Sequence, residues 1–162
     1  MTGDAEGHNT DGNEAPRTVT ASRRVQAPAS LVFELIADPA QQPRWDGNAN
    51  LAEAPGGQRV RAVGDVFTMT LTRGGGVREN HVVEFEESRL LAWMPSEVGK
   101  PRPGHLWRWQ LRPQPDGTTV VTHTYDWSNL TDVNRVERAR ATTSDKLMAS
   151  IDRLADLAEA QS

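Results

Sequence analysis

Residues 104–127 read GHLWRWQLRPQPDGTTVVTHTYDW, two runs of alternating apolar and polar residues separated by a Pro-Asp-Gly turn. Alternation with a period of two is typical of half-buried antiparallel strands. A turn at residues 115–117 that places Gln114 opposite Thr118 predicts a hairpin whose paired residues share one face. The predicted pairs are Trp107 with Tyr125, Trp109 with His123 and Leu111 with Val121.

The predicted face of this hairpin is unusual for a plain hydrophobic core. Two indoles, an imidazole and a phenol each carry a polar atom that needs a partner when it is buried. Such a face suits the wall of a cavity. The alternative interpretation is that Trp107 and Trp109 are simply large core residues of a two-layer fold.

Length and composition narrow the classes of protein. The chain has 162 residues and no internal repeat, which fits one domain with a sizeable core. It has no run of 18 apolar residues and no secretory pattern at its start, so we expect a cytoplasmic protein without stable membrane insertion. The absence of cysteine excludes thiolate zinc sites, disulfides and a cysteine nucleophile.

The net charge of -4 comes from the start of the chain, where four acidic residues precede Arg17. Residues 1–16 also contain no large aliphatic residue after Met1, so we expect a disordered acidic tail followed by one domain at residues 17–162. The remaining 18 acidic residues balance the 18 basic residues. A neutral domain without a basic run predicts no nucleic-acid partner.

The first half of the domain shows both helical and strand periodicity. We expect, in chain order, a strand at residues 17–26, a helix at 29–37 and a helical turn that carries Trp45 inward. A short strand near 50–54, another between the turns at 56–57 and 64–65, and a strand at 66–72 should follow. Alternation in the last of these strands places Phe67, Met69 and Leu71 on one side.

Residues 77–87 and 90–95 should form the next hairpin, about the dipeptide at 88–89. The predicted pairing joins Phe85 to Leu91 and Val83 to Trp93. If the alternation is unbroken, Glu79 and His81 then point inward, either as a general acid/base pair or as a hydrogen-bonded structural pair. A β-bulge anywhere in the strand would turn both residues outward, toward solvent.

A metal site built from Glu79, His81 and His123 is not expected. The strands that carry the two histidines are three steps apart, roughly 14 Å in a flat sheet. Zinc ligands must converge to about 2.2 Å from one ion. His8 lies in the tail and His105 beside a loop, so neither supplies a third ligand.

The C-terminal part carries two helical patterns. Leu147, Ile151 and Leu154 belong to an apolar stripe over residues 143–160, but the stripe breaks when it is extended backwards to Arg140. The Thr-Thr-Ser run at 142–144 offers N-cap residues. We therefore expect a short helix near residues 131–139 and a long one from about residue 143.

Three stretches carry a resemblance to a known family: VQAPASLVFELIADPAQQPRW, VVEFEESRLLAW and WRWQLRPQPDGTTVVTHTYDWSNL. Over about residues 17–160 the chain resembles the START-like, helix-grip superfamily called SRPBCC, and in particular its bacterial polyketide cyclase/dehydrase-like members. The resemblance implies an α+β fold. In it, a curved antiparallel sheet of six to seven strands, with two short helices after strand 1, wraps around a long C-terminal helix and encloses an elongated apolar cavity.

The superfamily hosts carriers, receptors, co-chaperones and enzymes on one scaffold, so the fold alone does not decide the function. We expect a hydrophobic, aromatic or polycyclic small-molecule ligand and no cofactor, and leave the oligomeric state open. The alternative is a polyketide cyclase/dehydratase-type enzyme, with Glu79, His81, His123 and Tyr125 as candidate catalytic residues. The predicted ligand-binding residues are Phe67, Met69, Glu79, His81, Trp93, Trp107, Trp109, His123, Tyr125, Leu147 and Ile151.

Two further interpretations stay secondary. A co-chaperone-like protein-binding module would need an exposed apolar patch or a basic face that the sequence does not reveal. If the ligand is acidic, Arg140 at the helix break and Arg108 are the first cations to test, although alternation places Arg108 on the outer face.

Overall fold

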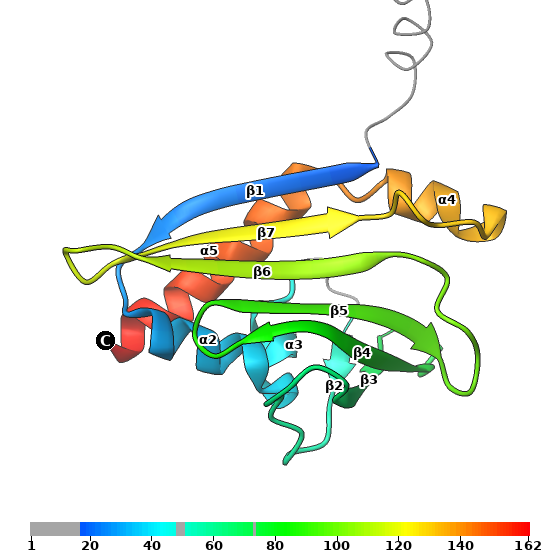
Figure 1. Cartoon of the computed structure of the whole chain (residues 1–162), viewed down its shortest axis with the longest axis horizontal. Coiled ribbons are helices and arrows are strands. Elements are labelled where there is room, and N and C mark those ends of the chain that lie inside the picture. Colours follow the sequence, from blue (N-terminus) through cyan, green and yellow to red (C-terminus); the bar gives the residue numbers. More distant parts are fainter. Residues whose placement is uncertain (1–16, 48–50, 73) are drawn as a thin grey trace, which may run out of the picture.

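The computed structural model describes residues 17–47, 51–72 and 74–162 (Figure 1). The predicted acidic tail at residues 1–16 lies outside the described residues. No helix in the described part of the chain is long and apolar enough to cross a membrane.

A seven-stranded, fully antiparallel sheet forms one layer of the molecule. Its strands are β1 (Thr18–Val25), β2 (Leu51–Glu53), β3 (Val66–Leu71), β4 (Val77–Glu86), β5 (Leu90–Glu97), β6 (Leu106–Pro113) and β7 (Thr119–Asp126). Their order across the sheet is β1-β7-β6-β5-β4-β3-β2, so the meander from β2 to β7 closes against the first strand. The predicted sheet of six to seven strands is confirmed, but the strand predicted between the turns at 56–57 and 64–65 is wrong, because residues 58–63 form no strand.

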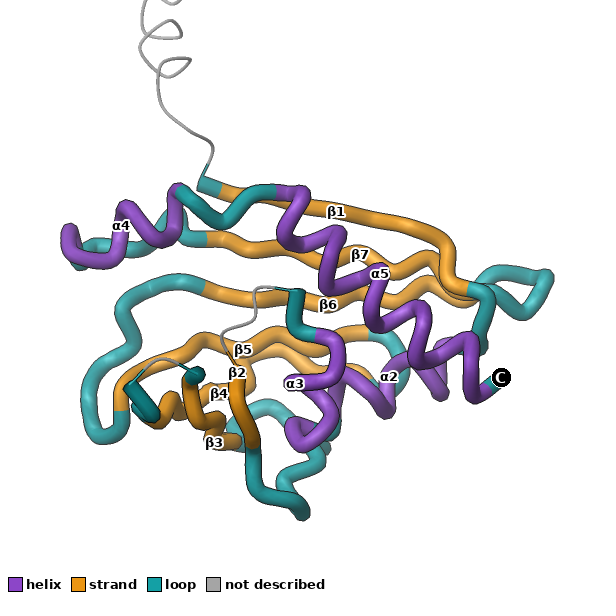
Figure 2. Tube along the Cα trace, turned by 180° about the vertical axis from the view of Figure 1, so that it is seen from behind, coloured by secondary structure: helices purple, strands orange, loops and turns teal. Residues whose placement is uncertain are grey.

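The helices form the second layer, as Figure 2 shows from behind. They are α2 (Ala29–Ala37), the 3-10 turn η1 (Pro39–Gln41), α3 (Gln42–Trp45), α4 (Val133–Arg140) and α5 (Ser144–Gln161). Helices α2, α3 and α5 lie on one face of the curved sheet, whereas α4 extends beyond the end of β7. As predicted, Thr143 caps α5, and its hydroxyl accepts a hydrogen bond from the Lys146 amide.

The central hairpin of β6 and β7 has the predicted register. The Gln114 amide donates to the Thr118 carbonyl at 2.8 Å across the turn. Cross-strand partners are Trp107 with Tyr125, Trp109 with His123 and Leu111 with Val121. Because paired residues in an antiparallel sheet lie on the same face, this register brings the aromatic side chains together.

The register of β4 against β5 differs from the prediction. Phe85 pairs with Leu91 as expected, but Trp93 pairs with Val82, and the register shifts between Val82 and Glu84. The shift leaves Val83 without a partner in this ladder and reverses the alternation in the first half of β4. The predicted pairing of Val83 with Trp93 is therefore wrong, and the inward positions of this half-strand are 78, 80 and 82 rather than 79 and 81.

Helix α5 contributes a fully buried stripe to the core. Leu147, Ile151 and Leu154 each have no exposed surface. At the other end of its contact surface, α5 meets the segment after α3 so closely that a Cβ on Gly47 would lie 2.6 Å from the Ser150 amide nitrogen. The Gly47 amide instead donates to the Ser150 hydroxyl at 2.8 Å. A glycine at position 47 thus lets α3 dock directly on α5.

Ile151→Ala should lower the free energy of unfolding by about 2–5 kcal/mol, because it removes fully buried methyl groups and leaves a cavity. Chemical denaturation measures this loss. Asp156→Ala, at an exposed position of the same helix, is the matched control and should change stability by less than about 0.5 kcal/mol. A cost for Ile151→Ala as small as the control's would contradict the described packing of α5.

Candidate functional site

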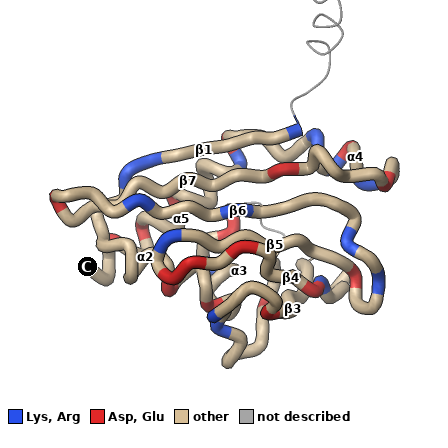
Figure 3. The backbone as a smooth tube through the Cα atoms, viewed as in Figure 1, with Lys and Arg blue, Asp and Glu red and all other residues tan. Residues whose placement is uncertain are grey.

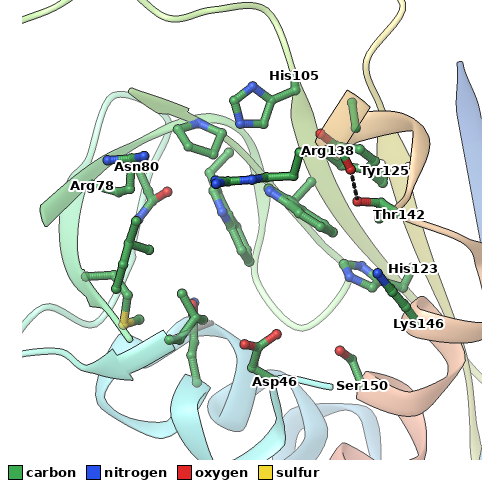
Figure 4. Close-up of a pocket in the computed structure, with 18 of the residues that line it drawn as sticks. Asp46, Arg78, Asn80, His105, His123, Tyr125, Arg138, Thr142, Lys146 and Ser150 are labelled. Atoms are coloured by element: carbon green, nitrogen blue, oxygen red, sulfur yellow. Dashed lines mark hydrogen bonds between the residues drawn. The ribbon is translucent and has the colours of Figure 1, made fainter. Parts of the chain in front are cut away.

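A cavity of about 600 Å³ lies between the sheet and helices α3, α4 and α5 (Figure 4). From the sheet it is lined by Met69, Arg78, Asn80, Trp93, Trp107, Trp109, His123 and Tyr125. From the helices and the segments beside them it is lined by Gln42, Trp45, Asp46, Arg135, Arg138, Lys146 and Ser150. A volume of this size is typical of small-molecule pockets.

One wall of the cavity is a row of contacting aromatic rings that begins in the core. Trp45 packs edge-on against Trp109, with ring centroids 5.1 Å apart. His123 stacks on Trp109 at 3.7 Å and lies nearly parallel to Trp107 at 5.6 Å. Trp107 continues the row to Tyr125, at 4.2 Å. The row follows from placing aromatic residues at alternate positions of two paired strands.

The row ends at His105, whose ring centroid lies 6.0 Å from that of Tyr125. His105 sits two residues before Trp107, in the short connection that leads into β6. Its Nδ1 is buried and has no hydrogen-bond partner among the described residues. Burial, followed by repulsion from Arg135, Arg78 and Arg138, lowers the pKa of His105 to about 4. The imidazole is therefore neutral near pH 7.

His123 is also held neutral. Burial lowers its pKa to about 3, although a hydrogen bond to the backbone opposes part of the shift. Its Nδ1 lies 3.0 Å from the Arg108 carbonyl oxygen. Since a carbonyl oxygen only accepts, the proton resides on Nδ1 and Nε2 is the unprotonated nitrogen. A base with so low a pKa is poorly matched to proton abstraction near neutral pH.

Tyr125 keeps its phenolic proton. Burial raises its pKa to about 12, and the nearby Arg138 and Arg135 offset only part of that effect. The hydroxyl is thus a hydrogen-bond donor across the physiological pH range. With two neutral imidazoles and one phenol, the part of the cavity wall formed by β6 and β7 carries polar atoms without formal charge.

Formal charge comes from the other parts of the wall, on β4 and on the helices. Arg78 enters from β4, Arg135 and Arg138 from α4, and Lys146 from the first turn of α5. Asp46 supplies a carboxylate at the end of α3. Figure 4 shows Asp46 and Ser150 at one end of the cavity and Arg78, Arg138 and His105 toward the other.

The predicted ligand-binding residues divide into three groups. Met69, Trp93, Trp107, Trp109, His123 and Tyr125 line the cavity. Phe67, Leu147 and Ile151 are buried in the core beside it and do not line it. Glu79 and His81 lie on the opposite face of the sheet. Contact of the lining residues with a ligand stays a prediction.

The inward orientation expected for Glu79 and His81 is wrong, because the register shift in β4 turns both residues outward. On the outer face, His81 Nε2 lies 3.0 Å from the Ser96 hydroxyl. The Glu79 carboxylate accepts a hydrogen bond from the Gly99 amide at 3.3 Å. Of the alternatives considered from sequence, the structure matches the β-bulge that turns both residues outward, and the two side chains do not form a pair with each other.

The cations proposed from sequence also differ from those at the cavity. Arg140 is exposed on α4 and does not line the cavity. Arg108 lies on the outer face, as its alternation predicted, and pairs with Glu84 at 2.7 Å. The cations missed were Arg78, because of the register shift, Lys146 at the start of α5, and Arg135 and Arg138 on α4. The two α4 arginines share a helical face with the buried Ala139, and this i, i+3, i+4 spacing was the available signal.

No three His, Asp or Glu side chains within residues 17–47, 51–72 and 74–162 are grouped so that they could hold a metal ion. His123 and His81 lie on opposite faces of the sheet, which separates two of the metal ligands considered from sequence.

Comparison with protein families gives a direct match. The family described as polyketide cyclase / dehydrase and lipid transport matches residues 16–159, nearly the whole domain. The chain belongs to this family. No curated protein matches the chain in sequence at a significant level. The family description covers both catalysis and transport, so membership is compatible with either role.

Solved structures show the same START-like fold. A protein from Mesorhizobium loti has a TM-score of 0.67 at 18% identity, over 90% of this chain and 99% of that one. A START superfamily protein from Mycobacterium smegmatis gives 0.64 at 15% identity, over 91% and 100%. The Zhui aromatase/cyclase from a Streptomyces species gives 0.64 at 17% identity, over 88% and 93%. At these identities the likeness concerns the fold, and the predicted helix-grip architecture is confirmed.

The buried neutral state of His123 predicts a pH dependence of stability. The folded pKa of about 3 lies below the ordinary value of 6.5, so the unfolded chain binds a proton in this interval and the folded protein does not. The free energy of unfolding should therefore fall as the pH falls from about 6.5 to about 5, by on the order of 1 kcal/mol per pH unit from His123.

Denaturation of the wild type and His123→Gln over this pH interval measures the effect. The variant should show a shallower loss of stability on acidification, since glutamine does not titrate, while His105 retains its own smaller contribution. Equal slopes in the two proteins would contradict a buried, neutral His123.

Proposed function

We propose that the protein binds a hydrophobic, aromatic or polycyclic small molecule in the cavity between the sheet and helices α3 to α5. The observation that carries this proposal is the open aromatic row, in which Trp107 and Tyr125 line the cavity while Trp109 anchors the row in the core. Planar ligands gain both apolar burial and ring stacking on such a wall.

The protonation states favour binding over proton-transfer catalysis. His123 and His105 have pKa values of about 3 and 4, and Tyr125 one of about 12. General catalysis works best when the pKa lies near the operating pH, and none of these three groups satisfies that condition. The same groups can orient a ligand by hydrogen bonds without exchanging protons.

Pyrenebutanol, a neutral polycyclic alcohol, is a suitable probe, because its pyrene fluorescence and the quenching of tryptophan emission both report binding. Trp107→Leu should weaken its binding by roughly two- to twelve-fold, since an aromatic contact contributes about 0.5–1.5 kcal/mol. Trp127→Leu is the matched control, because Trp127 is buried but does not line the cavity. The control should lower the melting temperature while leaving affinity unchanged.

Two results would count against the proposed function. One is a wild-type protein that neither binds pyrenebutanol nor is stabilised by it on heating. The other is an equal loss of affinity in both tryptophan variants, which would assign the effect to general destabilisation. Native mass spectrometry of the purified protein would additionally reveal a ligand carried through purification.

An enzyme of the cyclase/dehydratase kind is the second candidate, favoured by the position of the Tyr125 phenol in the cavity and by the family description. In that case Tyr125 would polarise a substrate carbonyl by donating a hydrogen bond. Tyr125→Phe should then reduce turnover of a linear poly-β-ketone thioester by roughly 10²-fold or more while pyrenebutanol affinity is kept. Absence of turnover by the wild type would count against the enzyme and leave ligand binding as the remaining proposed function.

A further inference from the structure

Cationic side chains gather at the end of the cavity near His105. Arg78 projects from β4 and Arg138 from α4, and Figure 4 shows both extending into this end from different walls. Arg135 lies one helical turn before Arg138 and also lines the cavity. Figure 3 shows that charges of both signs are intermixed along the chain, α4 included. The cationic character of this end therefore comes from which side chains line the cavity.

The nearby carboxylates neutralise only one of the three arginines. Arg135 pairs with Glu97 at 2.6 Å and with Asp132 at 3.1 Å. Within the described part of the chain, Arg78 and Arg138 make no ion pair and no side-chain hydrogen bond. Two guanidinium groups, with five donors each, are therefore available at the cavity.

The three arginines are close enough to act on one another and on their neighbours. The pKa of Arg78 is lowered chiefly by burial and next by repulsion from Arg135, with Arg138 adding a smaller effect against the attraction of Glu97. The same three arginines contribute to keeping His105 neutral. Because arginine does not lose its proton in proteins, a bound anion is the direct way to relieve this repulsion.

We propose that the ligand is an amphipathic acid, with an aromatic or polycyclic body on the row of Trp107 and Tyr125 and a carboxylate held between Arg78 and Arg138. This inference rests on the proposed function and names the chemical class of the ligand. The planar guanidinium matches the geometry of a carboxylate and can bind it through two parallel hydrogen bonds.

The orientation follows from the distribution of polar groups. The aromatic row offers no cation, and the guanidinium groups of Arg78 and Arg138 lie at one end of the cavity, away from Asp46 and Ser150. The acid therefore enters with its body toward Asp46 and Ser150 and its carboxylate at the arginines. Lys146 lines a different wall, near His123, and strengthens the positive potential without belonging to the proposed clamp.

The test compares pyrenebutyrate with pyrenebutanol, which share the pyrene body and chain and differ in the charge of the end group. The wild type should bind the acid roughly ten-fold or more tightly than the alcohol at low salt, as expected for hydrogen bonds to a charged group. Raising the salt concentration should reduce this preference, because the site lies at the edge of the cavity and is screened.

Arg138→Gln and Arg78→Gln should each reduce the preference for the acid by roughly five-fold or more while leaving pyrenebutanol affinity within about two-fold. Arg140→Gln is the matched control, since it removes the same charge from an exposed position two residues along α4. It should keep the wild-type preference. Arg138→Lys retains the charge but cannot form the two parallel hydrogen bonds of a guanidinium. Its preference for the acid should therefore lie between those of the wild type and Arg138→Gln.

Each outcome decides a stated point. Equal affinity of the wild type for acid and alcohol, or an undiminished preference in both Arg138→Gln and Arg78→Gln, would overturn the acid-binding inference while leaving the proposed function intact. A preference lost equally in Arg140→Gln would also overturn it, by assigning the effect to net charge. Failure of both probes to bind the wild type would refute the proposed function and this inference together.

Discussion

The stacking of His123 on Trp109, with ring centroids 3.7 Å apart, joins the hydrophobic core to the cavity wall. Trp109 is fully buried and packs against Trp45, whose indole nitrogen donates to the Leu35 carbonyl at 2.8 Å. A continuous set of contacts thus runs from α2 through α3 to the sheet and along the aromatic row. The buried stack leaves no room for water around a charged imidazolium. His123, which joins the wall to the core, is therefore held in its neutral form.

Most of the fold was predictable because its elements obey simple periodicity. The hairpin of β6 and β7 kept its register since one turn and an unbroken alternation determine it. The prediction for the first half of β4 was wrong because its alternation is broken. One unpaired residue, Val83, reverses which side chains face inward, and the Val-Val sequence does not mark the irregularity. Glu79 and His81 consequently exchanged faces with Arg78 and Asn80.

The candidate site was predictable only on its sheet side. Strand alternation brought Trp107, Trp109, His123 and Tyr125 to the cavity, but the wall made by α4 depends on where that helix packs, which no local pattern states. Arg135 and Arg138 line the cavity because α4 lies at the end of β7, whereas Arg140 on the same helix does not line it. Tertiary placement thus decided which arginines belong to the site.

The contacts that hold the helices weaken from the floor of the cavity to its charged end. At the floor, Gly47 lets α3 meet the backbone of α5, and the Arg153 side chain donates to the Asp46 carbonyl at 2.8 Å. At the charged end, α4 is tied to β5 through the partly exposed pair of Arg135 and Glu97. Such pairs contribute little to stability and are screened by salt. The floor is therefore fixed by direct backbone contact, whereas α4 is held by this partly exposed ion pair together with the buried Ala139.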